Sequence, residues 1–250
     1  MLNQITPAQI ARYKRFYVPG AEAKWTPFRR HRHAYLLGLL ANLEGDMAGL
    51  RRHFREAAVQ GVALLETRIP GEITGGDAIR QLEIPLMTAA AFGDLALRGA
   101  LAALPRALWF LPESKPELGL AEGFEALRHL AAEQPVEAPP LESMPNEAPE
   151  DSLAPPFGWA HPLARAILGI LRGDAGELHR GCASLLDGHE HEARAGRWTR
   201  VPEGLVALWP LALEAVARRR GVTAGVTSPY LPLAALDVPA PADDDAASGT

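Results

Sequence analysis

The chain has 250 residues, 48% of them hydrophobic and 22% charged, with a formal net charge of −5. These values are typical of a soluble globular protein with a full hydrophobic core, and they exclude a general nucleic-acid binder, which needs a basic surface. The single cysteine, Cys182, excludes an intramolecular disulfide, and since neither a signal peptide nor a membrane-spanning apolar stretch is recognised, we expect a cytoplasmic protein that does not contact a membrane.

Two threonine–proline pairs mark the start of the first predicted helices. Thr6 is placed as an N-cap, Pro7 suits the first helical position, and Gln9 completes a capping box. The same device recurs at Thr26 and Pro27, ahead of the helically spaced apolar residues of "AYLLGLLANL". The sequence therefore predicts one helix beginning at each pair.

Three Gly-Asp joints recur along the chain, in "LEGDMAGL", "FGDLAL" and "LRGDAGEL". A left-handed glycine would end one helix, and the aspartate side chain would cap the next. Catalytic aspartates would need partners at matching offsets, and none are found. We therefore expect structural joints between antiparallel helix pairs. The joints are Gly45 and Asp46, Gly93 and Asp94, and Gly173 and Asp174.

Prolines interrupt the middle of the chain. Pro85 is expected to kink the helix that begins near Asp77, or to end its first part. Residues 134–156 contain seven prolines and five acidic residues without Lys or Arg, a composition typical of an extended linker or a long surface loop. This composition divides the chain into an N-terminal helical part at 1–133, the linker at 134–156, a C-terminal helical part at 157–237 and a disordered tail at 238–250.

The C-terminal part is again predicted to be helical. One helix covers "WAHPLARAILGILRG", a second runs to about Leu186, and "DGHEHEARAGRWTRVPEG" follows as a polar connection, with a short helix within it as the alternative. A last helix is expected over "VPEGLVALWPLALEAVARRRG", with Pro202 near its start, a kink at Pro210 and Gly221 as its C-cap. Because no alternating run predicts a strand, the expected fold is all-α, with antiparallel helix pairs packed as a helical-repeat-like bundle.

Candidate chemical groups are few. His189 and His191 in "HEHE", like His31 and His33 in "HRH", are two residues apart and would point to different faces of a helix. No H-E-x-x-H pattern, third ligand, P-loop or G-x-S-x-G motif accompanies them. Cys182 lies on an apolar helix face and is expected to be a small buried hydrophobe. We therefore expect no catalytic residue, metal or cofactor, although a metal-dependent enzyme using "HEHE" stays open as a third hypothesis.

Residues from about 157 to 236 carry a family resemblance. The segments "LRGD", "ARRRG" and "SPYLPLAAL" resemble the immunity protein 49 family of bacterial polymorphic toxin systems. The resemblance implies an all-helical protein that binds and neutralises a cognate toxin made by the same cell. It rests on packing positions and therefore transfers no functional residue. Helical immunity proteins that guard against polymorphic nucleases share a tyrosine- and proline-containing C-terminus and remain an alternative.

A stoichiometric inhibitor needs a shaped and charged surface in place of catalytic groups. We expect the partner to be a toxin encoded by an adjacent gene, and the acidic residues Asp187, Glu190 and Glu192 are candidates for contacting it. The alternative is a tetratricopeptide-like scaffold that binds peptides, although the Gly-Asp joints lie 48 and 80 residues apart rather than at a regular period of about 34. The oligomeric state stays open.

Overall fold

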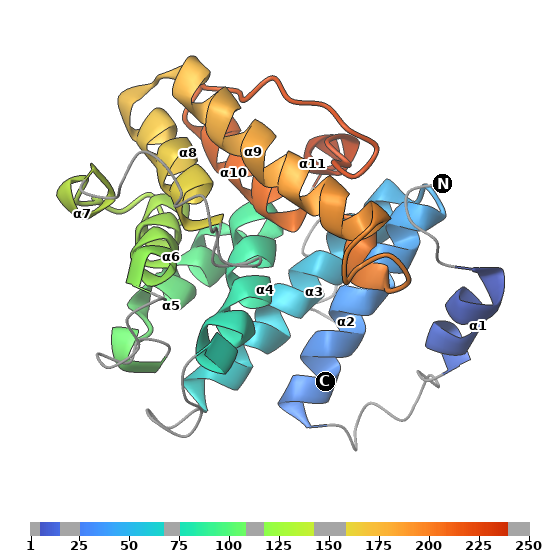
Figure 1. The fold of residues 1–250 in the computed structure, drawn as a ribbon. Helices are drawn as coiled ribbons and strands as arrows, with labels where there is room; N and C mark the ends of the chain where they lie inside the picture. The colour runs from blue at the N-terminus through green and yellow to red at the C-terminus, as the bar shows by residue number, and fades with distance from the viewer. Residues whose placement is uncertain (1–5, 16–25, 68–75, 109–117, 143–158, 240–250) are drawn as a thin grey trace.

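The structure, a computed structural model, describes residues 6–15, 26–67, 76–108, 118–142 and 159–239. Every regular element in these ranges is helical and none is a strand, which confirms the predicted all-α fold class. The helices pack side by side as a bundle, with α2 beside α3 and α8 beside α9 (Figure 1). The elements are α1 (Pro7–Arg15), α2 (Pro27–Leu43), α3 (Met47–Glu66), α4 (Gly76–Phe92), α5 (Leu95–Ala103), η2 (Arg106–Leu108), α6 (Leu118–Ala131), α7 (Pro139–Glu142), α8 (Ala160–Arg172), α9 (Ala175–Arg194), η5 (Pro202–Leu205), α10 (Leu208–Arg219) and α11 (Ala234–Asp237).

The first two helices begin at the threonine caps. Thr6 and Gln9 form the predicted capping box, in which the backbone N–H of Thr6 donates to Gln9 Oε1 at 2.9 Å and the N–H of Gln9 donates to Thr6 Oγ1 at 3.3 Å. Thr26 Oγ1 accepts from the N–H of Arg29 at 3.3 Å. The Gln9 side chain also donates to the carbonyl of Arg200 at 3.4 Å, so α1 lies against a turn from the other end of the chain.

The two tight helix pairs use Gly-Asp joints of the same form. Gly45 and Gly173 adopt left-handed φ angles of 73° and 67°, which glycine reaches without steric cost. Asp46 and Asp174 follow and cap α3 and α9, each accepting a hydrogen bond from a backbone N–H of the first turn at 2.7 Å and 2.9 Å. The chain thereby reverses within a few residues, and α2 packs along α3 and α8 along α9.

The third joint, between α4 and α5, differs from the other two in the backbone conformation of its glycine. Asp94 caps α5 by accepting from the N–H of Leu97 at 2.8 Å, and its second oxygen accepts from Arg55 at 2.9 Å. Gly93 is not left-handed. A Cβ at Gly93 would lie 2.6 Å from the carbonyl oxygen of Ala89, so the glycine here permits a close backbone approach.

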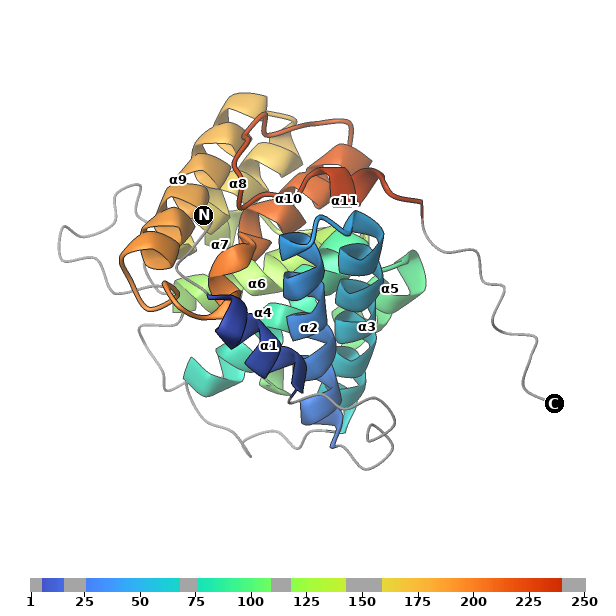
Figure 2. The ribbon, with the colours of Figure 1, turned by 90° about the vertical axis from the view of Figure 1, so that its right-hand side faces the viewer.

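Helix α10 forms the centre of the core. Residues 208–217 are all buried, as expected for a helix that is apolar on every side. It packs against α4 on one side and against α8 and α9 on the other (Figures 1 and 2). The buried Glu214 accepts from Arg218 Nε and from the N–H of Ala224, both at 2.8 Å, which fastens the segment after the helix. Helices from before and after the proline-rich segment therefore share one core.

The prediction of one kinked helix over residues 202–220 is wrong. The short 3₁₀ helix η5 comes first, and two non-helical residues, the extended Val206 and then Ala207, separate it from α10. This break is held by a hydrogen bond from the N–H of Ala207 to the carbonyl of Tyr230 at 2.7 Å. Pro210 consequently lies in the first turn of α10, where a missing N–H removes no intrahelical bond.

The predicted helix end near Leu186 is also wrong. Helix α9 continues without a break to Arg194. His189 and Ala193 are buried and continue the core-facing spacing of the earlier turns. The sequence pattern concealed this face because the core position 189 is occupied by a histidine.

Two proline-containing regions also contain helix. Helix α4 continues through Pro85 to Phe92, so the proline does not end the helix. Of the proline-rich segment 134–156, the structure describes residues 134–142, where α7 contacts α8 and Leu141 is buried in the core. The start of the predicted linker is thus part of the packed structure. The rest of that segment, and all but the first two residues of the predicted tail, lie outside the described residues.

Candidate partner-binding cleft

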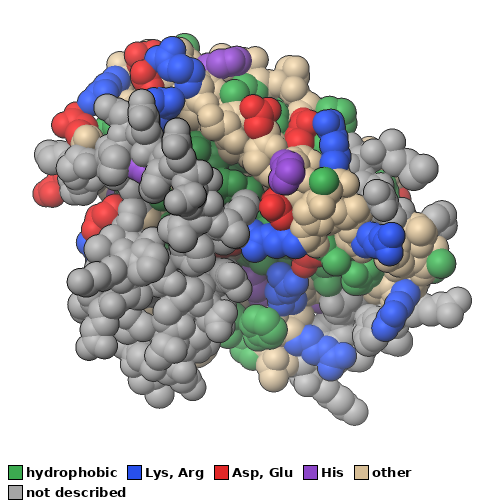
Figure 3. All heavy atoms as spheres, viewed as in Figure 1, with side chains coloured by type: hydrophobic (Ala, Val, Ile, Leu, Met, Phe, Trp, Pro, Cys, Tyr) green, Lys and Arg blue, Asp and Glu red, His purple; other side chains and the backbone are tan. Residues whose placement is uncertain are grey.

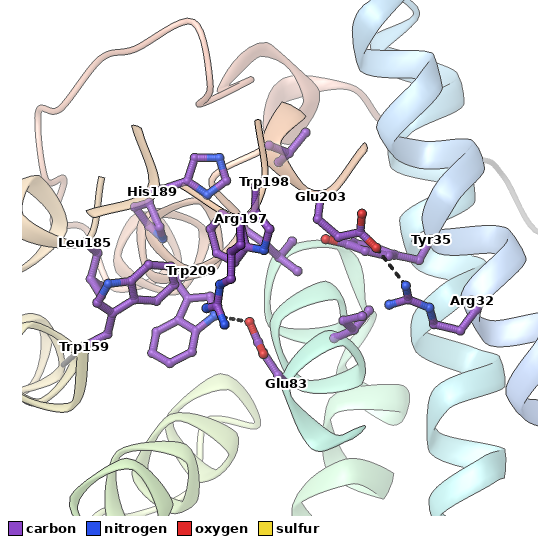
Figure 4. Close-up of a pocket in the computed structure, with 14 residues that line it drawn as sticks. Arg32, Tyr35, Glu83, Trp159, Leu185, His189, Arg197, Trp198, Glu203 and Trp209 are labelled. Atoms are coloured by element: carbon purple, nitrogen blue, oxygen red, sulfur yellow. Dashed lines mark hydrogen bonds and ion pairs between the residues drawn. The ribbon is translucent and has the colours of Figure 1, made fainter. Parts of the chain in front are cut away.

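A cleft of about 230 Å³ lies where α2, α4, α9 and the segment 197–210 meet (Figure 4). These elements come from distant parts of the chain, and the cleft exists because the core brings them together. Its lining combines aromatic rings with charged side chains. The lining residues are Arg32, Tyr35, Glu83, Ile84, Trp159, Leu185, His189, Arg197, Trp198, Glu203, Val206, Leu208, Trp209 and Pro210.

Three indole rings form one wall of the cleft. The ring of Trp159 lies 5.1 Å from that of Trp209 and 5.5 Å from that of Trp198, with interplanar angles of 81° and 66°. These edge-to-face arrangements are the favoured ones for aromatic pairs. Phe124 packs behind Trp209 at 5.2 Å. The wall is therefore held in a fixed position by ring contacts from several helices, and Trp159 and Trp209 are themselves buried in it.

Two polar contacts cross the cleft between elements. Trp209 Nε1 donates to Glu83 Oε1 at 2.7 Å, and Arg32 Nη2 donates to Glu203 Oε1 at 2.7 Å (Figure 4). The Arg32 guanidinium also lies 5.9 Å from the centre of the Tyr35 ring. Burial, reinforced by the nearby Glu203, raises the pKa of Tyr35, so the phenol stays neutral. The charged groups of the lining are therefore arginines and glutamates.

His189 lies in this lining and is 4% exposed. Burial lowers the pKa of its imidazole to about 4, and a hydrogen bond with the backbone of Gly204 opposes this effect only in part. The ring packs 5.0 Å from Trp198 and 5.5 Å from Tyr230. Its buried Nε2 finds no hydrogen-bond partner among the described residues. His189 thus adds a neutral ring and no charge near pH 7.

Three ion pairs, at the cleft and at the end of α9, expose their arginines more than their glutamates. The Arg194 side chain is 64% exposed and its partner Glu190 21%. Arg197 is 42% exposed and Glu192 12%. For Arg32 and Glu203 the values are 35% and 26%. In each of these three pairs the arginine is the more exposed partner, so the charged group that faces solvent more is positive.

The acidic residues proposed from the sequence have different surroundings. Glu190 accepts from the hydroxyl of Ser228 at 2.6 Å, and Glu192 accepts from the backbone N–H of Arg197 at 3.0 Å. Both carboxylates therefore accept hydrogen bonds from other groups of the same chain. Asp187 is exposed, but it lies two residues from the cleft-lining His189 and hence on another side of α9. The structure does not bring the three carboxylates together on the cleft.

In each histidine pair, the first side chain is buried and the second is more exposed. His189 is buried while His191 is exposed, so the two side chains cannot bind one ion together. In "HRH", His31 is buried and its Nδ1 lies 2.8 Å from the carbonyl of Ala57, with a pKa lowered by burial to about 4. Among the described side chains, no three His, Cys, Asp or Glu gather as a metal-binding group. Burial also raises the pKa of the Cys182 thiol to about 12, as expected for a core residue.

A second cavity of about 430 Å³ lies between α6 and residues 135–141. Glu122 and Glu125 line it, and both are paired within the protein, with Arg106 and Arg128 respectively. It lacks the aromatic wall of the first cleft. We therefore regard the aromatic cleft as the stronger candidate site.

Sequence reasoning missed this cleft. Its tryptophans are separated along the chain, and each taken alone predicts only a core position. A signal was nevertheless present, because three of the five tryptophans of this aromatic-poor chain line the site. A second was the arginine-rich pair of segments "FRRHRH" and "RAGRWTR", whose meeting in space depends on the fold.

Comparison with known proteins places the chain in a family. No helix among the described residues has the length and apolar character needed to cross a membrane. No curated protein and no solved structure matches the chain. The family described as immunity protein 49 matches residues 84–235, which include α5, α6, the proline-rich segment and the whole α8–α10 core, and span more than half of the chain. The resemblance seen in the C-terminal segments is thereby confirmed and extended toward the N-terminus: the chain belongs to the immunity protein 49 family.

Proposed function

We propose that this protein binds a bacterial toxin made by the same cell and neutralises it by forming a stoichiometric complex. Membership of the immunity protein 49 family supports this role. Inhibition by occupancy requires a complementary surface and no turnover, so we propose a non-enzymatic protein. We also propose that the toxin is encoded by an adjacent gene and that the complex forms in the cytoplasm.

The observation that carries this proposal is the composition of the cleft. Tyrosine, tryptophan and arginine are the residue types that most often dominate the binding energy of protein interfaces. The cleft gathers Trp198, Arg32 and Arg197 at one site, together with the buried Tyr35. The ring contacts behind it hold the apolar wall in place before a partner arrives, which lowers the entropic cost of binding.

Co-expression with the product of the adjacent upstream gene tests the proposal. The two genes are placed under separate inducers, and an unrelated soluble protein at the same level serves as the control. We expect the neighbour alone to stop growth, this protein to restore growth, and the two chains to co-purify at a one-to-one ratio. A neighbour that is harmless alone and does not co-purify would contradict the proposal and favour the peptide-binding helical scaffold instead.

A further inference from the structure

We propose that the toxin docks on the mouth of the aromatic cleft through an acidic surface. The partner chemistry is a cluster of Asp and Glu side chains around an apolar residue. This inference rests on the proposed function and specifies the partner of the same site. The receiving surface is a basic rim, defined as the cleft-lining Arg32 and Arg197 together with Arg29, Arg194 and Arg200, each of which lies three residues along the chain from one of them.

The rim is formed by two segments that contain no carboxylate. Neither residues 26–33 nor residues 194–202 include an Asp or Glu. Arg29 and Arg32 are three residues apart on α2 and therefore neighbours on the helix surface. The Arg32–Glu203 pair brings this face to the cleft, where the Arg197 guanidinium lies 5.0 Å above the ring of Trp198. Basic side chains gather across the middle and lower right of this face of the molecule (Figure 3).

The carboxylates near the rim face inward. The hydroxyl of Ser228 and the guanidinium of Arg194 hold Glu190 at 2.6 Å and 2.8 Å. Glu192 is held by the backbone N–H of Arg197. A partner that approaches from solvent therefore meets guanidinium groups before it meets carboxylates. On a chain of net charge −5, this local excess of positive charge selects an acidic partner surface.

An apolar anchor lies beside the rim. Phe28 is 50% exposed and is one of three large hydrophobic side chains that are exposed among the described residues, with Val59 and Leu95. It is four residues before Arg32 and seven before Tyr35, so all three share the helix face that leads into the cleft. An apolar centre surrounded by charged residues is the common anatomy of a protein–protein interface. The combination fits a partner that presents an apolar side chain among carboxylates.

A single-stranded nucleic acid would also be attracted by arginines and aromatic rings. The geometry favours a protein partner. Trp159 and Trp209 are 6% and 2% exposed, so their ring faces are covered by neighbouring rings and helices and do not form a stacking platform. The net negative charge of the chain further disfavours a polyanion that contacts a large surface.

Charge reversal on the rim tests the inference, with the toxic neighbour identified by co-expression as the probe. The test variants are Arg200→Glu and the double variant Arg197→Glu with Arg200→Glu. The matched control for the single variant is Arg220→Glu, which makes the same charge change at the far end of α10, about 16 Å along the helix from Trp209. Association rates are measured at low and high salt, and thermal melting verifies that each variant is folded. Arg200 forms no side-chain hydrogen bond or ion pair with another described residue, so its single variant keeps the test valid if the double variant unfolds.

We expect the double variant to associate about tenfold more slowly than wild type at low salt, with a smaller difference at high salt and an unchanged rate for the control. Equal rates for rim and control variants would overturn the acidic-partner inference while leaving the complex itself established. Faster association of the rim variants, or binding of a single-stranded oligonucleotide that the double variant loses, would overturn it too. If wild type forms no complex with a toxic neighbour, the proposed function fails, and that outcome is distinct from the others.

Discussion

Trp209 donates a hydrogen bond from its indole Nε1 to Oε1 of Glu83, at 2.7 Å and across 126 residues of sequence. The contact joins the first turn of α10 to α4 beneath the cleft. It also fixes the orientation of the indole that packs against Trp159 and Phe124. The shape of the aromatic wall therefore depends on one charge-assisted hydrogen bond between two halves of the fold.

Replacing Trp209 with Phe keeps an aromatic ring at this position and removes the donor. We expect a loss of about 1–3 kcal/mol in the free energy of unfolding, because a half-buried carboxylate loses the indole donor. Urea denaturation measures the loss, and Glu83→Gln, which can still accept the bond, is the control with the smaller expected effect. A Trp209→Phe protein as stable as wild type would show that the hydrogen bond contributes little.

Arg128 is a second buried link between helices. Its guanidinium donates to the carbonyls of Ala102 and Leu104 at 2.7 Å each, where α5 ends and its last carbonyls lack intrahelical partners. We expect Arg128→Met to lower the free energy of unfolding by about 3 kcal/mol, since these buried carbonyls are left without a donor. The exposed Arg52→Met should change stability by less than about 0.5 kcal/mol. Similar losses in the two variants would refute the capping role of Arg128.

Stability should fall as the pH falls below neutrality. The pKa values of His31 and His189 are lowered from 6.5 to about 4 by burial, so the unfolded chain takes up these protons first. Their contribution is complete above pH 6.5 and is lost progressively as the pH falls toward 4, by about 2 kcal/mol for each histidine at pH 5. Urea denaturation at pH 7.5 and pH 5 measures this loss. His189→Gln should remove about half of it, whereas the exposed His191→Gln should leave it unchanged; an undiminished loss in His189→Gln would contradict the assignment.

The α8–α9 joint depends on backbone geometry and a cap. Gly173 has φ of 67° and open space around the position of a Cβ, so the cost of Gly173→Ala, about 1 kcal/mol, comes from the backbone alone. Asp174→Ala should cost a similar amount through loss of the N-cap. Gly99→Ala is the matched control: the glycine lies inside α5 with equally open space and no left-handed angle, so alanine should stabilise the helix. Thermal denaturation of the three variants checks the opposite signs, and a stabilised Gly173→Ala would refute the argument.

The local features of the fold were predictable because their causes lie within a few residues. The Thr6–Gln9 capping box and the chain reversals at Gly45 and Gly173 follow from short-range sequence patterns. The start of α10 was not predictable in this way. It is set by the hydrogen bond between Ala207 and Tyr230, a contact that only the tertiary fold creates.

The candidate site was harder to predict than the helices. The acidic residues Glu190 and Glu192 read as a solvated loop, because a buried histidine at position 189 masks the core face of α9. In the folded chain their carboxylates turn inward, and the arginines paired with them face solvent. The sign of the surface charge therefore depends on side-chain direction, which sequence patterns do not specify.

The central claim is that a toxin binds at this cleft, and calorimetric titration of the toxic neighbour into two truncation variants tests it most directly. Phe28 and Leu95 are both large exposed apolar residues, 50% and 55% exposed, but only Phe28 lies on the helix face that leads into the cleft. We predict that Phe28→Ala weakens binding about tenfold or more, equivalent to about 1.4 kcal/mol, while Leu95→Ala binds like wild type. Equal affinities for wild type and Phe28→Ala, or a loss confined to Leu95→Ala, would place the toxin on another surface and contradict the account.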